Sequence, residues 1–353
     1  MSRRYRITHR TAYTYDDDVE NSYGRAYLIP RDNERQTCVR AAVRVDPEPA
    51  EQREHVDWFG NRSTYFSVTT PHRALTVLAE SVVTIDDPDP PPPAPGWSQV
   101  RDLLAADPLR SGLVPARLSS AGLVPAGLVP GGLVPGDEVA VARLLDARGF
   151  ALPSPRLPSL AAVATYARPS FRPGRPVDEA AVDLIERIHR DFRYVSGSTT
   201  VGSSVAELLD RGTGVCQDFA HLAVAGLRSV GLAARYVSGY LETVPPPGRE
   251  RLVGADASHA WAAVFTGTGW LHVDPTNDRA VDASYIEVAH GRDYADVPPL
   301  KGVIFSDATE SVMTVAVDVV RDDSDATART GLPVVHLGRP VTTEDVRARV
   351  DDR

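Results

Sequence analysis

The stretch at residues 211–240 constrains the fold and the chemistry of this chain more than any other. Within it a Gly-Thr-Gly turn at 212–214 precedes Cys216, and apolar residues at helical spacing then run to Val230, with Gly231 as the stop. This pattern predicts a helix that carries Cys216 in its first turn. The unpaired N–H groups and the positive helix dipole at that position favour a thiolate over a thiol. Because a lone cysteine is more often a small buried hydrophobic residue, the nucleophile hypothesis needs partner residues.

A hairpin further along the chain supplies such partners. Residues 256–261 read DASHAW, residues 270–276 read WLHVDPT, and a Thr-Gly-Thr-Gly turn signal separates them. If the turn is centred between its second and third residues, His259 lies opposite Thr276 and on the same face as Asp274. Diagonal neighbours on one face are about 7–8 Å apart between backbones, so a carboxylate can hold the imidazole.

These residues together predict a thiol nucleophile activated by a His–Asp pair, with Cys216 on a helix and His259 and Asp274 on adjacent strands. Because His272 has the same parity as Asp274, it could be mistaken for the base. The backbone N–H of Cys216 is the expected oxyanion donor, and Tyr194 and Trp261 are weak candidates for the second.

Two further polar residues of the thiol helix have structural interpretations. Asp218 lies in the first turn, where a carboxylate commonly caps the backbone donors of a helix. His221 lies off the face of the thiol and is expected to be a packed histidine.

Several segments resemble the bacterial transglutaminase-like proteins of the papain-like thiol superfamily. They are GVCQDFAHL, ARYVSGYL, DASHAW, DPTN and GRDYADVPP, with LIPR at 28–31 and DWFGN at 57–61 upstream. The resemblance implies an α+β fold in which the helix with Cys216 packs on an antiparallel sheet, next to an N-terminal antiparallel β domain. It also implies Cys216 as nucleophile, His259 as general base and acid, and Asp274 as its partner.

The predicted function is therefore a thiol enzyme that acts on a carboxamide or peptide bond through a thioester. Resolution of the thioester by water would make it an amidase or protease, and resolution by an amine would make it an acyltransferase. The alternative is a catalytically silent binding or scaffold module of the same fold. No calcium loop or other metal motif is found, so we expect no cofactor and no metal.

Composition restricts the partners and the compartment. The net charge of −9 and the pI near 5.5 disfavour a nucleic-acid surface, and Lys301 is the only lysine, so the chain could hardly donate amines to its own crosslinking. Cys38 and Cys216 cannot make a disulfide framework, and neither a signal peptide nor a membrane span is apparent. We expect a cytoplasmic protein with a peptide or protein substrate, of which a Gln or Asn side chain is one candidate.

The chain divides into five predicted segments. These are an N-terminal β domain (1–85), a proline-rich linker with an LVP-repeat insertion (86–156), the catalytic core (157–299), a C-terminal strand region (300–322) and a flexible tail (323–353).

Four local expectations accompany this division. Residues 16–18 should end the first strand, and Cys38 should be buried structure. The loop at 243–254 should edge the cleft, and a polar tract at 278–299 should brace it.

Overall fold

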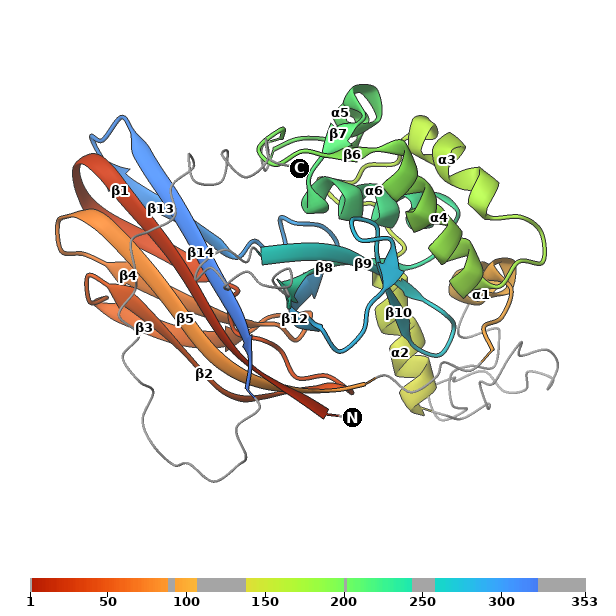
Figure 1. The fold of residues 1–353 in the computed structure, drawn as a ribbon, viewed down its shortest axis with the longest axis horizontal. Coiled ribbons are helices and arrows are strands. Elements are labelled where there is room, and N and C mark those ends of the chain that lie inside the picture. Colours follow the sequence, from red (N-terminus) through yellow and green to blue (C-terminus); the bar gives the residue numbers. More distant parts are fainter. Residues whose placement is uncertain (1, 88–92, 107–137, 200–201, 243–257, 323–353) are drawn as a thin grey trace, which may run out of the picture.

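The computed structural model describes residues 2–87, 93–106, 138–199, 202–242 and 258–322. A β domain and a core of helices on a sheet lie side by side, with the core sheet between the β domain and the helices (Figure 1). The α+β class predicted from the sequence is confirmed. The predictions for the LVP repeats, the 243–254 loop and the 323–353 tail fall outside the described residues. No helix among those residues combines the length and the apolar content needed to cross a bilayer.

One long strand, β1 (Ser2–Ala26), organises the β domain. Its side chains alternate, with Tyr5, Ile7 and His9 buried, as the sequence pattern predicts. It pairs with neighbours on both sides to give the strand order β2-β5-β1-β4-β3. The other strands of this order are β2 (Gln36–Asp46), β3 (Glu51–Val56), β4 (Arg62–Val68) and β5 (His72–Asp86).

The prediction that residues 16–18 end the first strand is wrong. The strand continues, and its pairing with β5 shifts register between Thr14 and Val19. The carboxylate of Asp16 accepts hydrogen bonds from the backbone N–H groups of Thr309 and Glu310 at 3.1 and 3.0 Å. Long-range partners therefore stabilise an extended conformation that the local residues alone do not favour.

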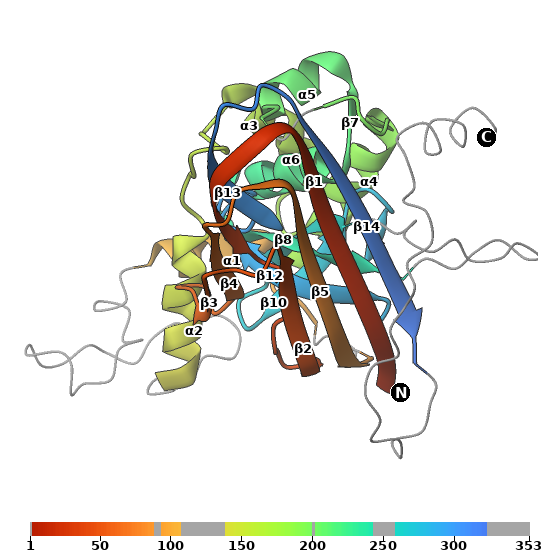
Figure 2. The same ribbon diagram turned by 90° about the vertical axis from the view of Figure 1, so that its left-hand side faces the viewer.

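The C-terminal strands complete the N-terminal sheet. Strand β13 (Leu300–Ser306) pairs with the end of β1, and β14 (Ser311–Arg321) pairs with its first half. Figure 2 shows β14 beside β1 along its length. The prediction that the alternating stretch at 312–320 is a strand is confirmed.

The core sheet has the order β11-β10-β9-β8-β12. Its strands are β8 (Ala234–Leu241), β9 (Ser258–Phe265), β10 (Trp270–Asp274), β11 (Arg279–Ala280) and β12 (Tyr285–Gly291). Helix α6 (Cys216–Ser229) packs on β8 and β9, and residues 217–227 of this helix are all buried.

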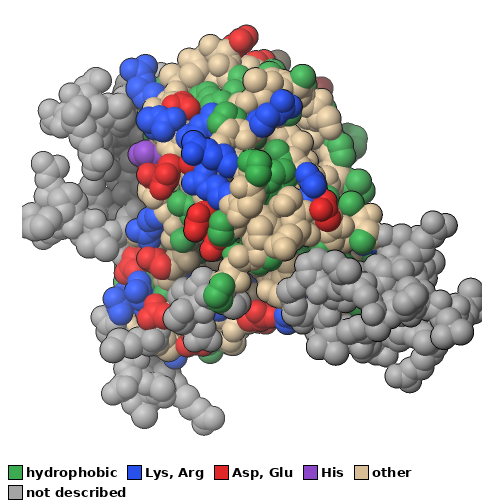
Figure 3. Space-filling view, turned by 90° about the vertical axis from the view of Figure 1, so that its right-hand side faces the viewer, with side chains coloured by type: hydrophobic (Ala, Val, Ile, Leu, Met, Phe, Trp, Pro, Cys, Tyr) green, Lys and Arg blue, Asp and Glu red, His purple; other side chains and the backbone are tan. Residues whose placement is uncertain are grey.

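The other helices are α1 (Trp97–Ala105), α2 (Glu138–Gly149), α3 (Ala161–Ala167), α4 (Val177–Asp191) and α5 (Val205–Arg211), with a 3-10 turn η1 (Arg168–Ser170) and short strands β6 (Arg193–Tyr194) and β7 (Thr213–Gly214). Of these, α3, α4 and α5 pack against α6, which explains why it is buried on most sides. On the outer face of the core, acidic and basic side chains are interspersed with scattered apolar ones (Figure 3). This distribution is typical of solvated faces of amphipathic helices.

The expectation of a polar tract at 278–299 is wrong for its central part. Strand β12 lies at the edge of the core sheet and all seven of its residues are buried, because the β domain covers it. Its carboxylate Glu287 and its imidazole His290, whose pKa burial lowers to about 3, have polar partners instead of water. Glu287 accepts from His290 Nδ1 at 2.7 Å and from Asn33 Nδ2 at 3.1 Å.

Two of the family-like motifs, LIPR and DWFGN, meet β12 at this junction. Arg31 donates to Asn61 Oδ1 at 2.8 Å and to His290 Nε2 at 3.1 Å. Asn61 also exchanges two hydrogen bonds with the backbone of His290, at 2.8 and 2.9 Å. We call Arg31, Asn61, Glu287 and His290 the domain clamp, because they join the β domain to the core. Buried charges of this kind hold a unique arrangement only when each has partners.

Candidate active site

Cys216 lies at the first position of α6, as predicted. Asp218 caps this end of the helix, because its Oδ2 accepts from the backbone N–H of Val215 at 2.9 Å and from the hydroxyl of Thr199 at 2.7 Å. Gly214 allows Asp218 to lie close to the turn, since a Cβ at position 214 would lie 3.0 Å from the Asp218 side chain and 2.8 Å from Leu208. The thiol is only partly buried. Cys216 therefore stands at the positive end of a buried helix with access to solvent.

The hairpin of β9 and β10 has the predicted register. Trp270 pairs with Phe265 and Val273 with Ala262, which places the turn centre between Gly267 and Thr268. Asp274 and His259 consequently share one face, and His259 Nε2 lies 2.7 Å from Asp274 Oδ2.

Asp274 accepts hydrogen bonds from five donors although it is fully buried. Its Oδ1 accepts from the backbone N–H groups of Thr276 and Asn277, and its Oδ2 accepts from His259, from the Asn277 amide at 2.6 Å and from the Tyr285 hydroxyl at 2.8 Å. Burial raises the pKa of a carboxyl group, but the donors outweigh it and lower the pKa of Asp274. The carboxylate is therefore ionised and fixed in orientation.

His259 is held between Asp274 and Cys216. Burial lowers the pKa of an imidazole, but hydrogen bonds to Asp274 and Cys216, together with their charges, raise the pKa of His259 to about 10. Because Nε2 is bonded to Asp274, Nδ1 is the nitrogen left for the thiol. The structure thus brings together all three residues that the sequence singled out, in the order thiol, imidazole, carboxylate.

The other nearby histidines lie apart from this group. His221 is a buried residue of α6 whose Nε2 accepts from the backbone N–H of Tyr294 at 3.1 Å, and burial lowers its pKa to about 4. His272 Nδ1 accepts from the indole N–H of Trp261 at 3.0 Å. This bond commits the Trp261 donor to His272 and removes Trp261 as an oxyanion donor, which corrects that candidate.

Tyr194 lies at the rim of the site. Burial and then the charge of Cys216 raise the pKa of Tyr194, so its hydroxyl lies within the electrostatic reach of the thiol. Its side chain is half exposed. Of the two side-chain oxyanion candidates, Tyr194 is the one that the structure leaves beside Cys216.

Sequence reasoning missed Tyr285 and Asn277 as supports of the carboxylate. Asn277 ends the DPTN motif, so its position was a signal that could have been used. Tyr285 lies in the segment that was interpreted as polar, and only the pairing of β12 with β8 brings it to Asp274.

Cys38, the second cysteine, lies far from this group in the β domain. It is partly buried on β2, and its Sγ lies 3.6 Å from the carbonyl oxygen of Arg40. Burial raises the pKa of the Cys38 thiol. Among the residues that the structure describes, no group of three or more His, Cys, Asp or Glu side chains is arranged to hold a metal ion.

Comparisons with known proteins agree with this architecture. The bacterial transglutaminase-like N-terminal region matches residues 5–84, and the transglutaminase-like superfamily matches residues 164–275. An uncharacterized protein of Mycobacterium tuberculosis (strain H37Rv) is 48% identical over 328 residues, which cover 92% of this chain and 94% of the relative. One of Mycobacterium leprae is 33% identical over 321 residues, covering 90% and 99%.

A solved structure shares the fold at low sequence identity. A protein of Cytophaga hutchinsonii that is provisionally assigned as a cysteine protease superposes with a TM-score of 0.63 at 19% identity, and 93% of each chain is covered. The fold and the site thus define a transglutaminase-like core with a thiol, an imidazole and a carboxylate in contact. This chain belongs to the bacterial transglutaminase-like family.

Proposed function

We propose that the protein is a thiol enzyme that cleaves a carboxamide or peptide bond through the residues Cys216, His259 and Asp274. One observation carries the proposal. The imidazole of His259 bonds to the Asp274 carboxylate at 2.7 Å on one side and to the Cys216 thiol on the other. Nucleophile, base and orienting carboxylate in contact are the arrangement that thiol-dependent acyl transfer requires.

The reaction proceeds in two acyl-transfer steps. His259 takes the thiol proton, and the sulfur of Cys216 attacks the carbonyl carbon to form a tetrahedral oxyanion. The C–N bond then breaks, His259 returns the proton to the leaving amine or ammonia, and a thioester remains on Cys216. His259 next removes a proton from water or from a second amine, whose attack releases an acid or a new amide and restores the thiol.

The oxyanion is stabilised at the start of α6. The backbone N–H of Cys216 has no acceptor within its helix, because the first N–H groups of a helix have no intrahelical partner. The Tyr194 hydroxyl, beside Cys216, is the proposed second donor.

The substrate is proposed to be a peptide or protein, with a glutamine or asparagine carboxamide as the first candidate. Both cysteines are free thiols, a state that suits the reducing cytoplasm in which we place the reaction.

Alkylation by iodoacetamide tests the thiol–imidazole pair. In a Cys38→Ser background Cys216 is the only thiol, so total labelling reports on it alone. We expect rapid labelling at pH 7 that falls at least about tenfold in His259→Gln, since one pKa unit of lost stabilisation corresponds to a factor of ten. Equal rates in the two proteins would refute the pairing.

Release of ammonia from glutamine- and asparagine-containing peptides tests the chemistry. Activity that is present in the Cys38→Ser protein and absent from the Cys216→Ala protein would support the enzyme. Prompt labelling of Cys216 without release of ammonia or a new N-terminus from any peptide of a broad library would favour the silent module.

A further inference from the structure

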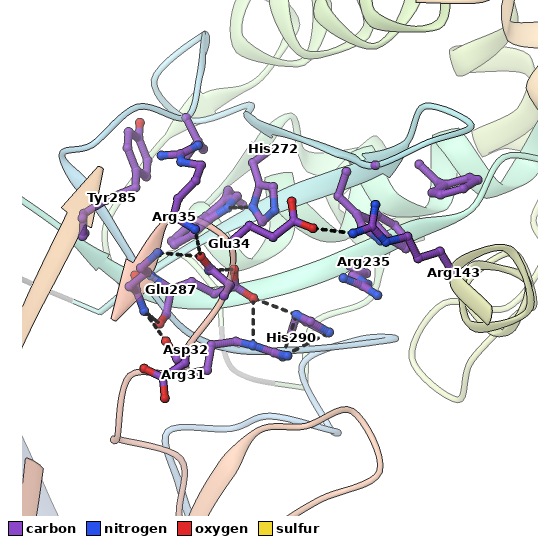
Figure 4. Close-up of a pocket in the computed structure, with 18 of the residues that line it drawn as sticks. Arg31, Asp32, Glu34, Arg35, Arg143, Arg235, His272, Tyr285, Glu287 and His290 are labelled. Atoms are coloured by element: carbon purple, nitrogen blue, oxygen red, sulfur yellow. Dashed lines mark hydrogen bonds and ion pairs between the residues drawn. The ribbon is translucent and has the colours of Figure 1, made fainter. Parts of the chain in front are cut away.

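A cavity of about 340 Å³ lies on the face of the core sheet next to the β domain (Figure 4). Its walls are the segment at 31–36, the side chains of Arg143 and Asp146 from α2, and residues of β8, β9, β10 and β12. Cys216, His259 and Asp274 are not among its described lining residues. We call this cavity the back pocket. Its volume falls within the range of small-molecule sites, about 300–1,000 Å³.

The acidic side chains of the back pocket already have partners. Glu34 is paired with Arg143 at 2.8 Å and Asp146 with Arg235 at 2.5 Å. Glu287 is bonded within the domain clamp. None of these carboxylates is left to receive a further cation.

Arg35, in contrast, lacks an acceptor for its guanidinium among the described residues. Its Nε is buried without a partner. Burial lowers the pKa of Arg35, although the charges of Asp282, Glu287 and Asp87 oppose this effect. Two of these acids are engaged elsewhere, since Asp282 bonds to Ser284 and Asp87 pairs with Arg3 at 3.6 Å. A partly buried guanidinium without an acceptor is a costly feature that an anion would relieve.

His272 contributes a second donor. Because the indole N–H of Trp261 can only donate, His272 Nδ1 must accept, and the proton of the neutral ring is on Nε2. Burial lowers the pKa of His272 to about 4, so the ring is neutral at pH 7. Its Nε2–H has no acceptor among the described residues, and Figure 4 shows the ring between the Arg35 and Arg235 sides of the back pocket.

Another part of the lining is aromatic and aliphatic. Trp270 lies under the guanidinium of Arg235, with 3.7 Å between the Cζ atom and the ring centroid. Trp261, Phe265, Ile85 and Val281 add apolar surface. The back pocket therefore offers an unsatisfied cation and a neutral donor beside an apolar wall.

We propose that the back pocket binds a small organic carboxylate. The carboxylate accepts from the guanidinium of Arg35 and from His272 Nε2–H, and the apolar body of the ligand lies against Trp261 and Trp270. Tyr285 connects the two sites, since it lines the back pocket and its hydroxyl donates to Asp274 at 2.8 Å.

Titration calorimetry with benzoate tests the proposal, and quenching of tryptophan fluorescence provides a second signal. The protein carries Cys216→Ala, so the result does not depend on the proposed reaction. Benzamide matches the shape of benzoate without its charge, and inorganic phosphate supplies an anion without an apolar body. We expect saturable binding of benzoate and at least tenfold weaker binding of benzamide and of phosphate.

Arg35→Gln should weaken benzoate at least tenfold, whereas Arg172→Gln removes an exposed arginine elsewhere and should leave benzoate binding unchanged. Thermal unfolding confirms that each variant folds, and the comparison of benzoate with benzamide stands without any variant. Equal binding of benzoate and benzamide, absence of saturation with benzoate, or full affinity in a folded Arg35→Gln protein would overturn the proposal. Phosphate binding as tight as benzoate would overturn its organic part.

Discussion

Substitution of Asp274 by asparagine tests whether the carboxylate stabilises a charged imidazole. Burial opposes the charge on His259, and its bonds and charges with Asp274 and Cys216 raise the pKa from 6.5 to about 10. If Asp274 supplies about half of this rise, Asp274→Asn lowers the pKa of His259 to about 8, which is about 2 kcal/mol of imidazolium stabilisation. Asparagine retains the shape of the side chain but carries no charge.

NMR titration of ¹³C-labelled histidine measures the effect. The chain has 9 histidines, and a His259→Gln spectrum assigns the resonance. Tyr285→Phe is the matched control, because it removes one donor to Asp274 and leaves the charge in place. A pKa of His259 that is the same in Asp274→Asn and in the unsubstituted protein would refute the role of the carboxylate.

The same pair predicts a pH dependence of stability. The folded-state pKa of His259 lies above its unfolded value of 6.5. The contribution of the imidazolium to folding is therefore complete below about pH 6.5 and is lost as the pH rises through about 10. The difference in free energy of unfolding between the unsubstituted protein and Asp274→Asn should shrink between pH 6 and pH 10.5 in urea titrations. A difference that does not change with pH would show that the imidazole is neutral in the folded protein.

Two further predictions concern the packing around the site. Glu287→Gln should destabilise the protein by about 3–5 kcal/mol in urea unfolding, because it leaves the buried clamp residues without their anion, whereas the exposed Glu54→Gln should change stability by less than about 1 kcal/mol. Since the pKa of Glu287 is lowered on folding, the contribution of its carboxylate to the free energy of unfolding is full at neutral pH and declines as the pH falls below 4.5. A destabilisation by Glu287→Gln that stays the same in acid would contradict this account. Gly239→Ala places a Cβ 2.2 Å from the carbonyl oxygen of Ile286 and 2.5 Å from the Trp261 ring, and should lower the free energy of unfolding by about 1–3 kcal/mol or more. Gly269→Ala, which meets nothing within 4 Å, should be nearly neutral, and similar effects of the two substitutions would disprove the steric argument.

The parts of the site that local chemistry determines were predictable from the sequence. The Thr-Gly-Thr-Gly turn fixes the register of the β9–β10 hairpin, and side chains alternate along a strand, so the shared face of His259 and Asp274 follows. Both ends of α6 were predictable for a similar reason. The Gly-Thr-Gly turn before Cys216 marks the start of the helix, and Gly231 marks its end.

The parts that depend on remote segments were not predictable. Strand β3 has mostly exposed side chains and therefore lacks the alternation by which the other strands were found. Asp16 lies in a strand where the β13–β14 turn, nearly 300 residues later, supplies donors for its carboxylate. The polar residues of β12 suggested a segment exposed to solvent, although the β domain buries them. For Asp16 and β12 the deciding partner is distant in the sequence.

The β domain contacts the strand that supports Asp274 and is more than an appended module. The side-chain amide of Gln36 donates to the carbonyl of Glu287 at 2.7 Å and accepts from its backbone N–H at 2.9 Å, so it occupies the free edge of β12 as another strand would. That strand presents Tyr285 to Asp274, and Asp274 orients His259. Two side chains, Tyr285 and Asp274, thus connect the strand that Gln36 contacts to the imidazole. This continuity explains why the domain clamp is built from polar groups with several partners each, since an apolar contact would permit the edge strand to slide, whereas fixed hydrogen bonds do not.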